Sequence, residues 1–421
     1  MDRLKKLLLS QTIKDTLISF LGLGFAAVVG FFFTVILARY LGPEQFGIFS
    51  AVTAPDSIVY SLGDLGIAAS LINFIPKLKD KRNELINTTF SFEIFVGAII
   101  LVIFVGFSIF HESIIPGSLG KQILIAGALA INYLLISFIQ GIFTAERRFL
   151  RYSFTQIIDS GIKIILILIL MSVSGLSVES ALLANFVSTL IALAFTFGKE
   201  FFHIKFSLEK DLLQKIFHFA KWLAINRVFG VFISRIDVLL LNLLVGSFQA
   251  GIFSAANRIT LLFSLLVSSL GSVVNPRFSS FGEDREKISS YIKKLLGLVS
   301  LISAVMLILV FLAEPIINIV YGEKYLTAIP VFQMMTLAMI IFVFQLVTIP
   351  PIIFSFNQPK FVARLTALQV VVLVVLEIIL IPSLGALAPA IALGAANIIA
   401  IIFSGIKLYQ LLNSKPVKSI S

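Results

Sequence analysis

Ionisable side chains lie inside the long apolar segments of this 421-residue chain, and they gather in one of them. Well inside the segment 213–244 lie three cations: Lys221, Arg227 and Arg235. The next apolar segment adds Arg258. Each such residue costs about 2.5–3.5 kcal/mol at the centre of a membrane span, so it is a candidate for function. Guanidinium groups stay charged where water is excluded, and their forked N–H groups match phosphate oxygens. The pattern predicts a binding site for an anion.

Helical spacing places these cations beside neutral polar side chains. Lys221, Arg235 and Asn242 fall on one broad face of a helix, and Ser254 shares a stripe with Arg258 on the next helix. Such polar faces cannot lie against lipid, so we expect them to line a wet central cavity. The predicted substrate-binding residues are Arg227, Arg235, Arg258, Lys221, Asn257, Asn242 and Ser254.

The alternative is that these charges are neutralised within the protein. Asp237 is a candidate partner for Arg258, and Asp159 lies four residues before Lys163, a spacing that pairs side chains on one helix face. We interpret the Asp159–Lys163 pair as structural. For the two arginines of segment 213–244 we favour a binding role, because too few carboxylates lie near them in sequence to neutralise both.

Buried carboxylates are candidates for carrying a coupling ion. Asp56, Asp64 and Glu377 lie in apolar segments, where burial disfavours the charged form and promotes uptake of a proton or Na⁺. The alternative is a carboxylate at the membrane edge or beside an arginine, and for Asp64 the two interpretations are equal. Glu377 lies deep in an apolar segment and is the better candidate for a proton.

Several kinds of chemistry are excluded by what the sequence lacks. The chain has no cysteine and three widely spaced histidines, so we expect no metal site. It has no phosphate-binding G-x-x-x-x-G-K-[ST] loop, so we expect no nucleotide to bind there. Neither H-E-x-x-H nor G-x-S-x-G occurs. We therefore expect no cofactor, apart from a coupling H⁺ or Na⁺, and no enzymatic activity.

The composition predicts an all-helical, polytopic membrane protein. Hydrophobic residues make up 58% of the chain and charged residues 13%, which is too little polar surface for soluble domains. In the segment 330–356, Pro350 and Pro351 break the helical hydrogen bonding and form either a hinge or a fixed kink. Twelve segments are apolar and long enough to span a bilayer: 16–38, 45–75, 85–110, 121–144, 152–173, 178–198, 213–244, 248–275, 290–313, 330–356, 361–381 and 386–411. We expect the long second, seventh and eighth segments to tilt, kink or extend beyond the bilayer.

Basic residues alternate between the two sides of these twelve segments. Of the 33 Lys and Arg residues, 25 fall on the side of the N-terminus, 3 on the opposite side and the rest inside the segments. By the positive-inside rule, this charge distribution predicts a multi-pass protein of the cell membrane with both termini in the cytoplasm. It also accounts for the net charge of +11 without nucleic acid.

An internal repeat divides the chain. Residues 42–51 (GPEQFGIFSA) match residues 246–255 (GSFQAGIFSA), and each copy follows the first segment of a six-segment half. Because six is even, both halves have the same orientation, which predicts a parallel repeat with a substrate site between two lobes. The predicted lobes are 1–205 and 206–421.

The motifs resemble those of a known family. Residues 38–50 (ARYLGPEQFGIFS), followed by Asp64-Leu-Gly-Ile67 and Ser70, resemble the start of the polysaccharide-transporter family, which includes the O-antigen flippases of the multidrug/oligosaccharidyl-lipid/polysaccharide (MOP) exporter superfamily. Residues 235–237, 251–258 and 321–325 resemble second-half motifs of that family.

The resemblance implies a V-shaped pair of lobes that works by alternating access. It implies that a polyprenyl-diphosphate-linked oligosaccharide moves from the cytoplasmic to the outer leaflet of the cell membrane, alongside a glycan polymerase or glycosyltransferase machinery. The cation-rich segments agree with a diphosphate headgroup, although a fold alone does not define a substrate.

Two other transport functions stay open as alternatives. One is a cation-coupled multidrug exporter of the same superfamily (a MATE-type exporter), which needs an acidic cavity. The other is a flippase for the peptidoglycan precursor, lipid II; relatives with that role often have two further C-terminal helices. A membrane-bound glycan polymerase would need large outer loops, whereas the longest ones expected here, 110–121 and 314–329, are short.

Overall fold

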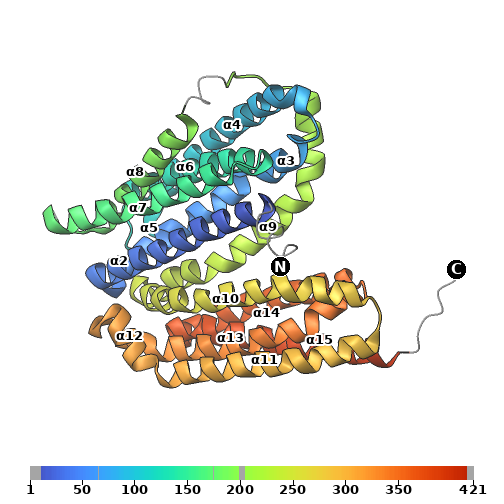
Figure 1. Cartoon of the computed structure of the whole chain (residues 1–421). Coiled ribbons are helices and arrows are strands. Elements are labelled where there is room, and N and C mark those ends of the chain that lie inside the picture. The colour runs from blue at the N-terminus through green and yellow to red at the C-terminus, as the bar shows by residue number, and fades with distance from the viewer. Residues whose placement is uncertain (1–10, 65, 174, 199–203, 415–421) are drawn as a thin grey trace. The chain divides into compact units, whose positions relative to one another are not determined.

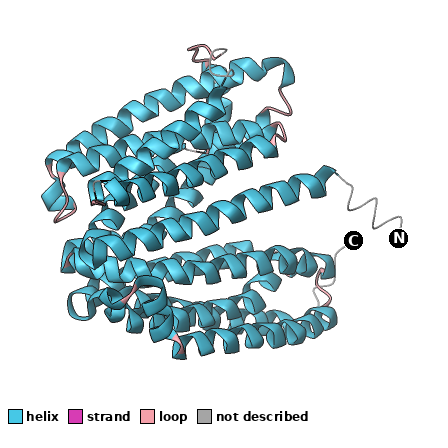
Figure 2. Ribbon diagram, turned by 60° about the vertical axis from the view of Figure 1, so that its left-hand side comes forward, coloured by secondary structure: helices cyan, strands magenta, loops and turns pink. Residues whose placement is uncertain are grey.

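The computed structural model describes residues 11–64, 66–173, 175–198 and 204–414, without the side chains of residues 11–21, 23, 57, 61 and 221–234. The described chain is helical almost throughout, with short connections and no strand in these ranges (Figure 2). Contacts divide it into two compact units, Met1–Phe248 and Gln249–Ser421. The lobes predicted from the repeat, 1–205 and 206–421, stay a prediction.

The first unit begins with a long helix that is broken in its middle. In α2 (Gln11–Asp64) the backbone leaves the helical conformation at Gly42, with φ 74° and ψ 172°, at the position where the first and second predicted segments separate. A second break at Gly66, with φ 77°, precedes α3 (Ile67–Phe74). A Cβ atom at Gly66 would lie 3.1 Å from the Cβ atom of Ala220 on α9, so glycine also permits this close approach. The second predicted segment is therefore kinked, as we expected.

Seven more helical elements complete the first unit, and they lie side by side in Figure 1. Helix α6 packs against α2, α4 and α8, while α7 packs against α2 and α8, and α9 packs against α2 and α3. Phe138 and Phe143 of α6 are fully buried in the apolar core that these helices share. The elements are η1 (Lys79–Lys81), α4 (Arg82–Ile109), α5 (His111–Ile114), α6 (Gly120–Ala145), α7 (Phe149–Val173), α8 (Val178–Phe197) and α9 (Lys210–Val245).

The second unit is a bundle whose core is built mainly from α10, α11 and α13, with single side chains from η4 and α15. Phe278 of α10, Val299 of α11 and Val343 of α13 are completely buried in one apolar cluster. Its elements are α10 (Ser247–Phe281), α11 (Arg285–Phe311), α12 (Ala313–Tyr321), η3 (Glu323–Ala328), α13 (Ile329–Pro350), η4 (Pro351–Ser355), α14 (Pro359–Leu384), η5 (Gly385–Leu387) and α15 (Ala388–Asn413).

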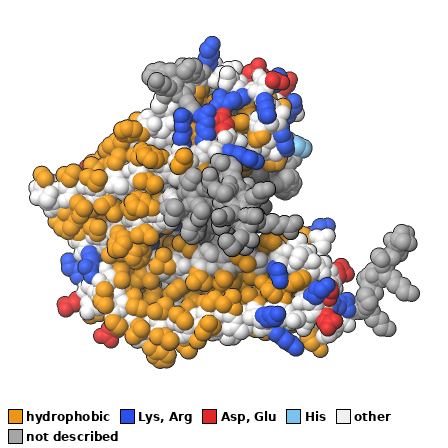
Figure 3. Space-filling model, viewed as in Figure 1, with side chains coloured by type: hydrophobic (Ala, Val, Ile, Leu, Met, Phe, Trp, Pro, Cys, Tyr) orange, Lys and Arg blue, Asp and Glu red, His pale blue; other side chains and the backbone are white. Residues whose placement is uncertain are grey.

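The helices expose apolar side chains along their flanks, as a multi-span membrane protein must. Val102, Val173 and Phe311 are each more than 70% exposed. Figure 3 shows apolar side chains over the helix flanks and Lys and Arg toward the helix ends. Within the described ranges, nine stretches are long and apolar enough to cross a membrane. Two of them, Gly24–Phe74 and Pro359–Asn413, contain more than one α-helix. Helix α9 is not among the nine. The predicted number of twelve spans is not established by this count.

Candidate functional site

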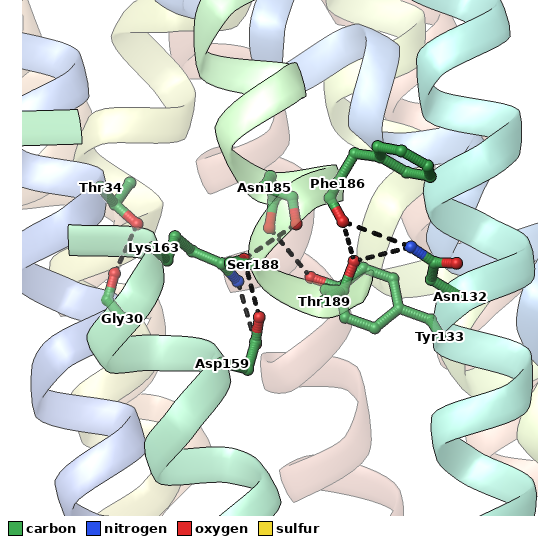
Figure 4. Close-up of polar contacts among 10 residues, drawn as sticks. All are labelled: Gly30, Thr34, Asn132, Tyr133, Asp159, Lys163, Asn185, Phe186, Ser188 and Thr189. Carbon is green, nitrogen blue, oxygen red and sulfur yellow. Dashed lines mark hydrogen bonds and ion pairs between the residues drawn. The ribbon is translucent and has the colours of Figure 1, made fainter. Parts of the chain in front are cut away.

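A buried ion pair lies inside the first unit. Lys163 Nζ is 3.1 Å from Asp159 Oδ2, one helical turn earlier on α7, and each side chain is 12% exposed. The hydroxyl of Ser188 on α8 donates a 2.8 Å hydrogen bond to the other carboxylate oxygen of Asp159 (Figure 4). The pairing predicted from the four-residue spacing is therefore confirmed. The pair has the polar partners that burial of two charges requires.

Neutral polar side chains extend this cluster across three helices. The amide of Asn132 on α6 donates to Thr189 Oγ1 (3.0 Å) on α8, and Tyr133 Oη donates to Asn185 Oδ1 (3.3 Å). Tyr133 also lies within hydrogen-bonding reach of Lys163. The network thus joins α6, α7 and α8 through side chains that are all at least partly buried.

Asp56 brings a second carboxylate to the same region. It lies on α2, is 3% exposed, and interacts electrostatically with Tyr133. The ammonium of Lys163 is 5.6 Å from the ring centroid of Phe33, also on α2. Asp56, Asp159 and Lys163 thus bring two carboxylates and one ammonium group to the same region of the first unit.

On α9, the structure describes two of the four predicted binding residues. Arg235 is partly buried and interacts electrostatically with Asp237 two residues further on. Asn242 is 1% exposed, and its amide donates a 3.3 Å hydrogen bond to the carbonyl of Pro116, which indicates a packing role. The side chains of Lys221 and Arg227 lie outside the described part.

In the second unit, three predicted binding residues share the first turns of α10. Ser254, Asn257 and Arg258 are all partly buried, and Ser254 and Arg258, four residues apart, share one helix face. Arg258 interacts electrostatically with Tyr321 at the end of α12, and the hydroxyl of Tyr321 donates to the Ala255 carbonyl (2.9 Å). The Arg258 guanidinium and the Ser254 hydroxyl therefore lie on one face of α10.

The other predicted coupling carboxylates lie in different surroundings. Asp64 is the last residue of α2 and is completely buried, and its Oδ1 accepts a hydrogen bond from the backbone N–H of Ala68 (3.1 Å) in the first turn of α3. That contact caps α3 and supports a structural role. Glu377 is completely buried within α14. In the described ranges, no three His, Cys, Asp or Glu side chains are grouped to hold a metal ion.

The predicted helix break at Pro350 and Pro351 coincides with a π-helical turn. Helix α13 ends at Pro350, and η4 continues it over five residues in the wider π conformation. The hydroxyl of Ser355 donates a 2.8 Å hydrogen bond to the carbonyl of Phe278 on α10. This bond ties the turn to its neighbour, and π-helical turns are frequent at functional sites.

Basic side chains gather at one end of each unit. In the first, Glu146 after α6 contacts both Arg82 at the start of α4 and Arg148 before α7, so these two turns of the chain meet. In the second, Arg285 at the start of α11 donates to the hydroxyl of Ser414 after α15 (3.2 Å). The turns that the charge pattern assigned to one side of the membrane therefore meet within each unit.

Sequence reasoning missed the neutral members of the buried cluster. Asn132, Tyr133, Asn185, Ser188 and Thr189 carry no charge, so the search for ionisable residues in apolar segments passed over them. The available signal was the helical spacing of the last three, which lie three and four residues apart on one face.

Comparison with known proteins identifies the family. Residues 36–330 match the family described as "Polysaccharide biosynthesis protein". A "probable low-salt glycan biosynthesis flippase" of Haloferax volcanii is 26% identical over 384 residues, which are 87% of this chain and 77% of that protein. The succinoglycan biosynthesis transport protein of Rhizobium meliloti is 23% identical over 311 residues, 72% of this chain and 61% of that one.

Solved structures show the fold. A lipid II flippase in an inward closed conformation has a TM-score of 0.75 at 17% identity, covering 93% of this chain and 87% of that one. An inward-facing multidrug resistance transporter of the MATE family, in the MOP superfamily, has a TM-score of 0.69 at 17% identity, covering 94% of this chain and 100% of that one. The chain therefore belongs to the polysaccharide biosynthesis protein family and has the helical fold of the MOP-superfamily transporters.

Proposed function

We propose that the protein is a flippase that moves a polyprenyl-diphosphate-linked oligosaccharide from the cytoplasmic to the outer leaflet of the cell membrane. The observation that carries this proposal is that each unit holds a partly buried guanidinium group, Arg235 on α9 and Arg258 on α10, in a chain of the polysaccharide biosynthesis family. Arginine retains its charge in low dielectric and binds phosphate oxygens with two parallel hydrogen bonds. A diphosphate headgroup needs this chemistry during its passage.

The proposed site combines these arginines with other polar residues of the same helices. Arg227 and Lys221 would add positive charge, and Ser254 and Asn257 would meet sugar hydroxyls. The polyprenyl tail would stay in lipid while the head crosses. The protein would work with glycan-assembling enzymes, which supply the substrate and consume the product.

The proposed architecture has twelve spans in two six-helix lobes with a parallel repeat, arranged as a V that alternates access. An amide contact that recurs in both units supports the repeat. In the first, Asn132 links α6 to α8; in the second, Gln345 of α13 donates to Asn397 Oδ1 of α15 (3.0 Å). By the positive-inside rule, the basic end of each unit and both termini would be cytoplasmic.

We further propose that a proton or Na⁺ couples to transport through a buried carboxylate. Asp56 is supported by its burial near Tyr133 and the Asp159–Lys163 pair, and Glu377 by its complete burial. Asp64 is the weakest of the three, since it caps α3.

Flipping of a fluorescent polyprenyl-diphosphate oligosaccharide in proteoliposomes tests the function. We expect the wild-type protein to flip this lipid, and Arg258→Ala to lower the rate about tenfold or more, because a hydrogen bond to a charged group contributes about 1.5–3 kcal/mol. Arg277→Ala is the matched control: it removes the same charge from the exposed end of the same helix.

If wild type and Arg258→Ala flip the lipid at the same rate, Arg258 is not part of the binding site. No flipping by wild type, in vesicles where a known flippase works, would reject the substrate. Lipid II, which shares the diphosphate, and cationic drugs would then test the two alternative functions.

A further inference from the structure

A pocket at the basic end of the first unit presents hydrogen-bond donors on one side and apolar side chains on the other. It has a volume of about 370 Å³ and lies between the ends of α4, α6 and α8. Its polar lining comes from two arginines and two asparagines: Arg82, Asn83, Asn87 and Arg148. No carboxylate lines its described wall. It is remote in sequence from the α9 and α10 residues of the proposed substrate site.

A carboxylate behind the pocket fixes the two guanidinium groups. Glu146 Oε1 accepts from Arg82 Nε at 2.5 Å, and Glu146 Oε2 is 2.9 Å from Arg148 Nε. Glu146 is 13% exposed, whereas the arginines are 35% and 38% exposed. The three side chains carry one net positive charge, and two guanidinium groups have ten N–H donors, more than one carboxylate can accept. The carboxylate therefore orients both arginines at the pocket.

The backbone turn after α6 sets this geometry. Arg147 adopts the left-handed conformation, with φ 58°. The N–H of Arg147 bonds to the Thr144 carbonyl (3.2 Å), and that of Arg148 to the Phe143 carbonyl (2.7 Å), which together close a Schellman turn. Glycine usually occupies the left-handed position, so an arginine there carries backbone strain. The turn brings Glu146 and Arg148 to the pocket on either side of this residue.

The asparagines are oriented by contacts made by their oxygen atoms. Asn87 Oδ1 accepts from the backbone N–H of Lys205 (2.9 Å), and Asn83 Oδ1 accepts from Arg82 Nη1 (3.1 Å). With each oxygen held in this way, the Nδ2 groups are the ends that a ligand can meet. All four polar side chains can therefore donate to one anion.

An apolar groove adjoins the pocket. The ring of Phe197 lines both the pocket and a second cavity of about 660 Å³ between α7 and α8. Phe154 and Phe195, exposed by 63% and 72%, line this groove on opposite helices, and Arg151 lies near its start. The position of Phe197 makes the two cavities neighbours, one rich in donors and one apolar.

We propose that the pocket and groove together bind an anionic phospholipid, with its phosphate among Arg82, Arg148 and the two asparagines and an acyl chain between α7 and α8. Basic pockets between membrane helices are suited to lipid headgroups. A pocket of about 370 Å³ accommodates one headgroup, and the apolar groove gives a chain a surface that free phosphate could not use. The lipid would bridge α4, α6, α7 and α8 and stabilise this end of the unit. This inference goes beyond the proposed function and does not depend on it.

Two isosteric variants of the full-length protein test the proposal. Asn87→Asp keeps the oxygen that accepts from Lys205 but replaces the donor by a negative oxygen facing the phosphate. Asn73→Asp is the control at the same end of the unit, because the Asn73 oxygen also accepts a hydrogen bond, here from the Lys77 ammonium, and lies outside the pocket. Thermal unfolding in detergent is measured with and without dioleoyl phosphatidylglycerol, since a ligand that binds only the folded state raises the melting temperature.

We expect phosphatidylglycerol to raise the melting temperature of wild type and of Asn73→Asp in a saturable manner, and to leave Asn87→Asp unchanged. Arg148→Gln serves as a second variant and should shift the half-saturating lipid concentration upward by about tenfold or more. An equal response of Asn87→Asp and wild type would overturn the proposal.

Further additions identify the source of the ligand. Inorganic phosphate and dioleoyl phosphatidylcholine should each give less than a tenth of the shift. An equal rise in melting temperature with phosphate would mean that the groove does not contribute to binding. An equal rise with phosphatidylcholine would mean that the site does not recognise charge. Either result would overturn the proposal. A shift with a polyprenyl phosphate but none with phosphatidylglycerol would assign the pocket to a substrate-like lipid and overturn the phospholipid assignment.

Discussion

At the scale of single residues, charge was predictable from the sequence and neutral partners were not. Asp159 and Lys163 were predicted to pair from their spacing alone, and they do. Ser188, which completes the pair, lies 29 residues from Asp159 in the chain, and no local pattern connects the two. Asn242 illustrates the reverse case: its amide was predicted to face a cavity, but its contact with Pro116 depends on tertiary packing.

Removal of Lys163 tests the structural role of this pair. Lys163→Met leaves the Asp159 carboxylate buried without its counter-ion, and we expect the free energy of unfolding to fall by about 3 kcal/mol. Asp159→Asn with Lys163→Met should recover most of this loss, because asparagine still accepts from Ser188 and neither charge of the pair is left buried without the other. Denaturant unfolding followed by circular dichroism measures both changes. Lys215→Met, on an exposed side chain of α9, is the control, and an equal stability of the two single variants would contradict the structural role.

At the scale of helices, length and apolarity predicted where the elements lie, and Pro350 and Pro351 predicted one break. The repeat motif begins at Gly42, where α2 breaks, and Pro350-Pro351 coincides with the π-helical turn. The break at Gly66 was expected only as a kink somewhere in a long segment, because the close approach of Ala220 from α9 cannot be read from that segment alone. Contacts between distant helices are the information that a single segment lacks.

The N-terminus of α11 makes a prediction about pH. Asp284 caps this helix: its side chain accepts from the backbone N–H of Lys287 (3.1 Å) and is 2.7 Å from the Lys287 ammonium. The hydrogen bond from the Lys287 side chain lowers the pKa of Asp284 below its ordinary value. A lowered folded-state pKa gives stability that is present above the unfolded value, about 4, and is lost as the pH falls through the folded value.

Comparing the melting temperatures of wild type and Asp284→Asn between pH 7 and pH 2 checks this expectation. Wild type should be the more stable protein at pH 7, and the two curves should converge as the carboxylate becomes protonated. A difference that is the same at every pH would mean that the ionised carboxylate does not contribute.

At the scale of the whole molecule, the pattern of basic residues predicted which turns lie on the same side of the membrane. Contacts within each unit are consistent with that prediction. Arg82 and Arg148 meet at Glu146, and Arg285 meets Ser414, although these residues lie far apart in sequence. The positive-inside rule needs only a count of Lys and Arg in successive loops, so the side of each loop could be predicted from the sequence. Contacts within a unit, such as that of Asn242 with Pro116, could not be predicted, since they depend on how distant helices pack.

Cysteine labelling tests the proposed topology directly. The natural chain contains no cysteine, so single cysteines can be introduced and labelled with a membrane-impermeant maleimide. In intact cells we expect Lys121→Cys and Lys324→Cys to react, and Lys81→Cys and Lys287→Cys to react only after the membrane is permeabilised. The reverse pattern would place the basic ends outside, and a mixed pattern would contradict the alternation on which twelve spans depend.

The placement of Asp159 and Lys163 on one helix also bears on how the protein is made. Helix α7 carries both charges itself, one turn apart, so its apolar stretch 152–173 can enter the bilayer during synthesis as an electrically neutral segment. Two charges on separate helices would each cost about 2.5–3.5 kcal/mol until the partner arrived. Both residues of the pair precede α8 in the chain, and Ser188 of α8 adds a hydrogen bond to a carboxylate that its own helix already balances. The biogenesis of this unit can therefore proceed helix by helix, with its polar interior assembled last.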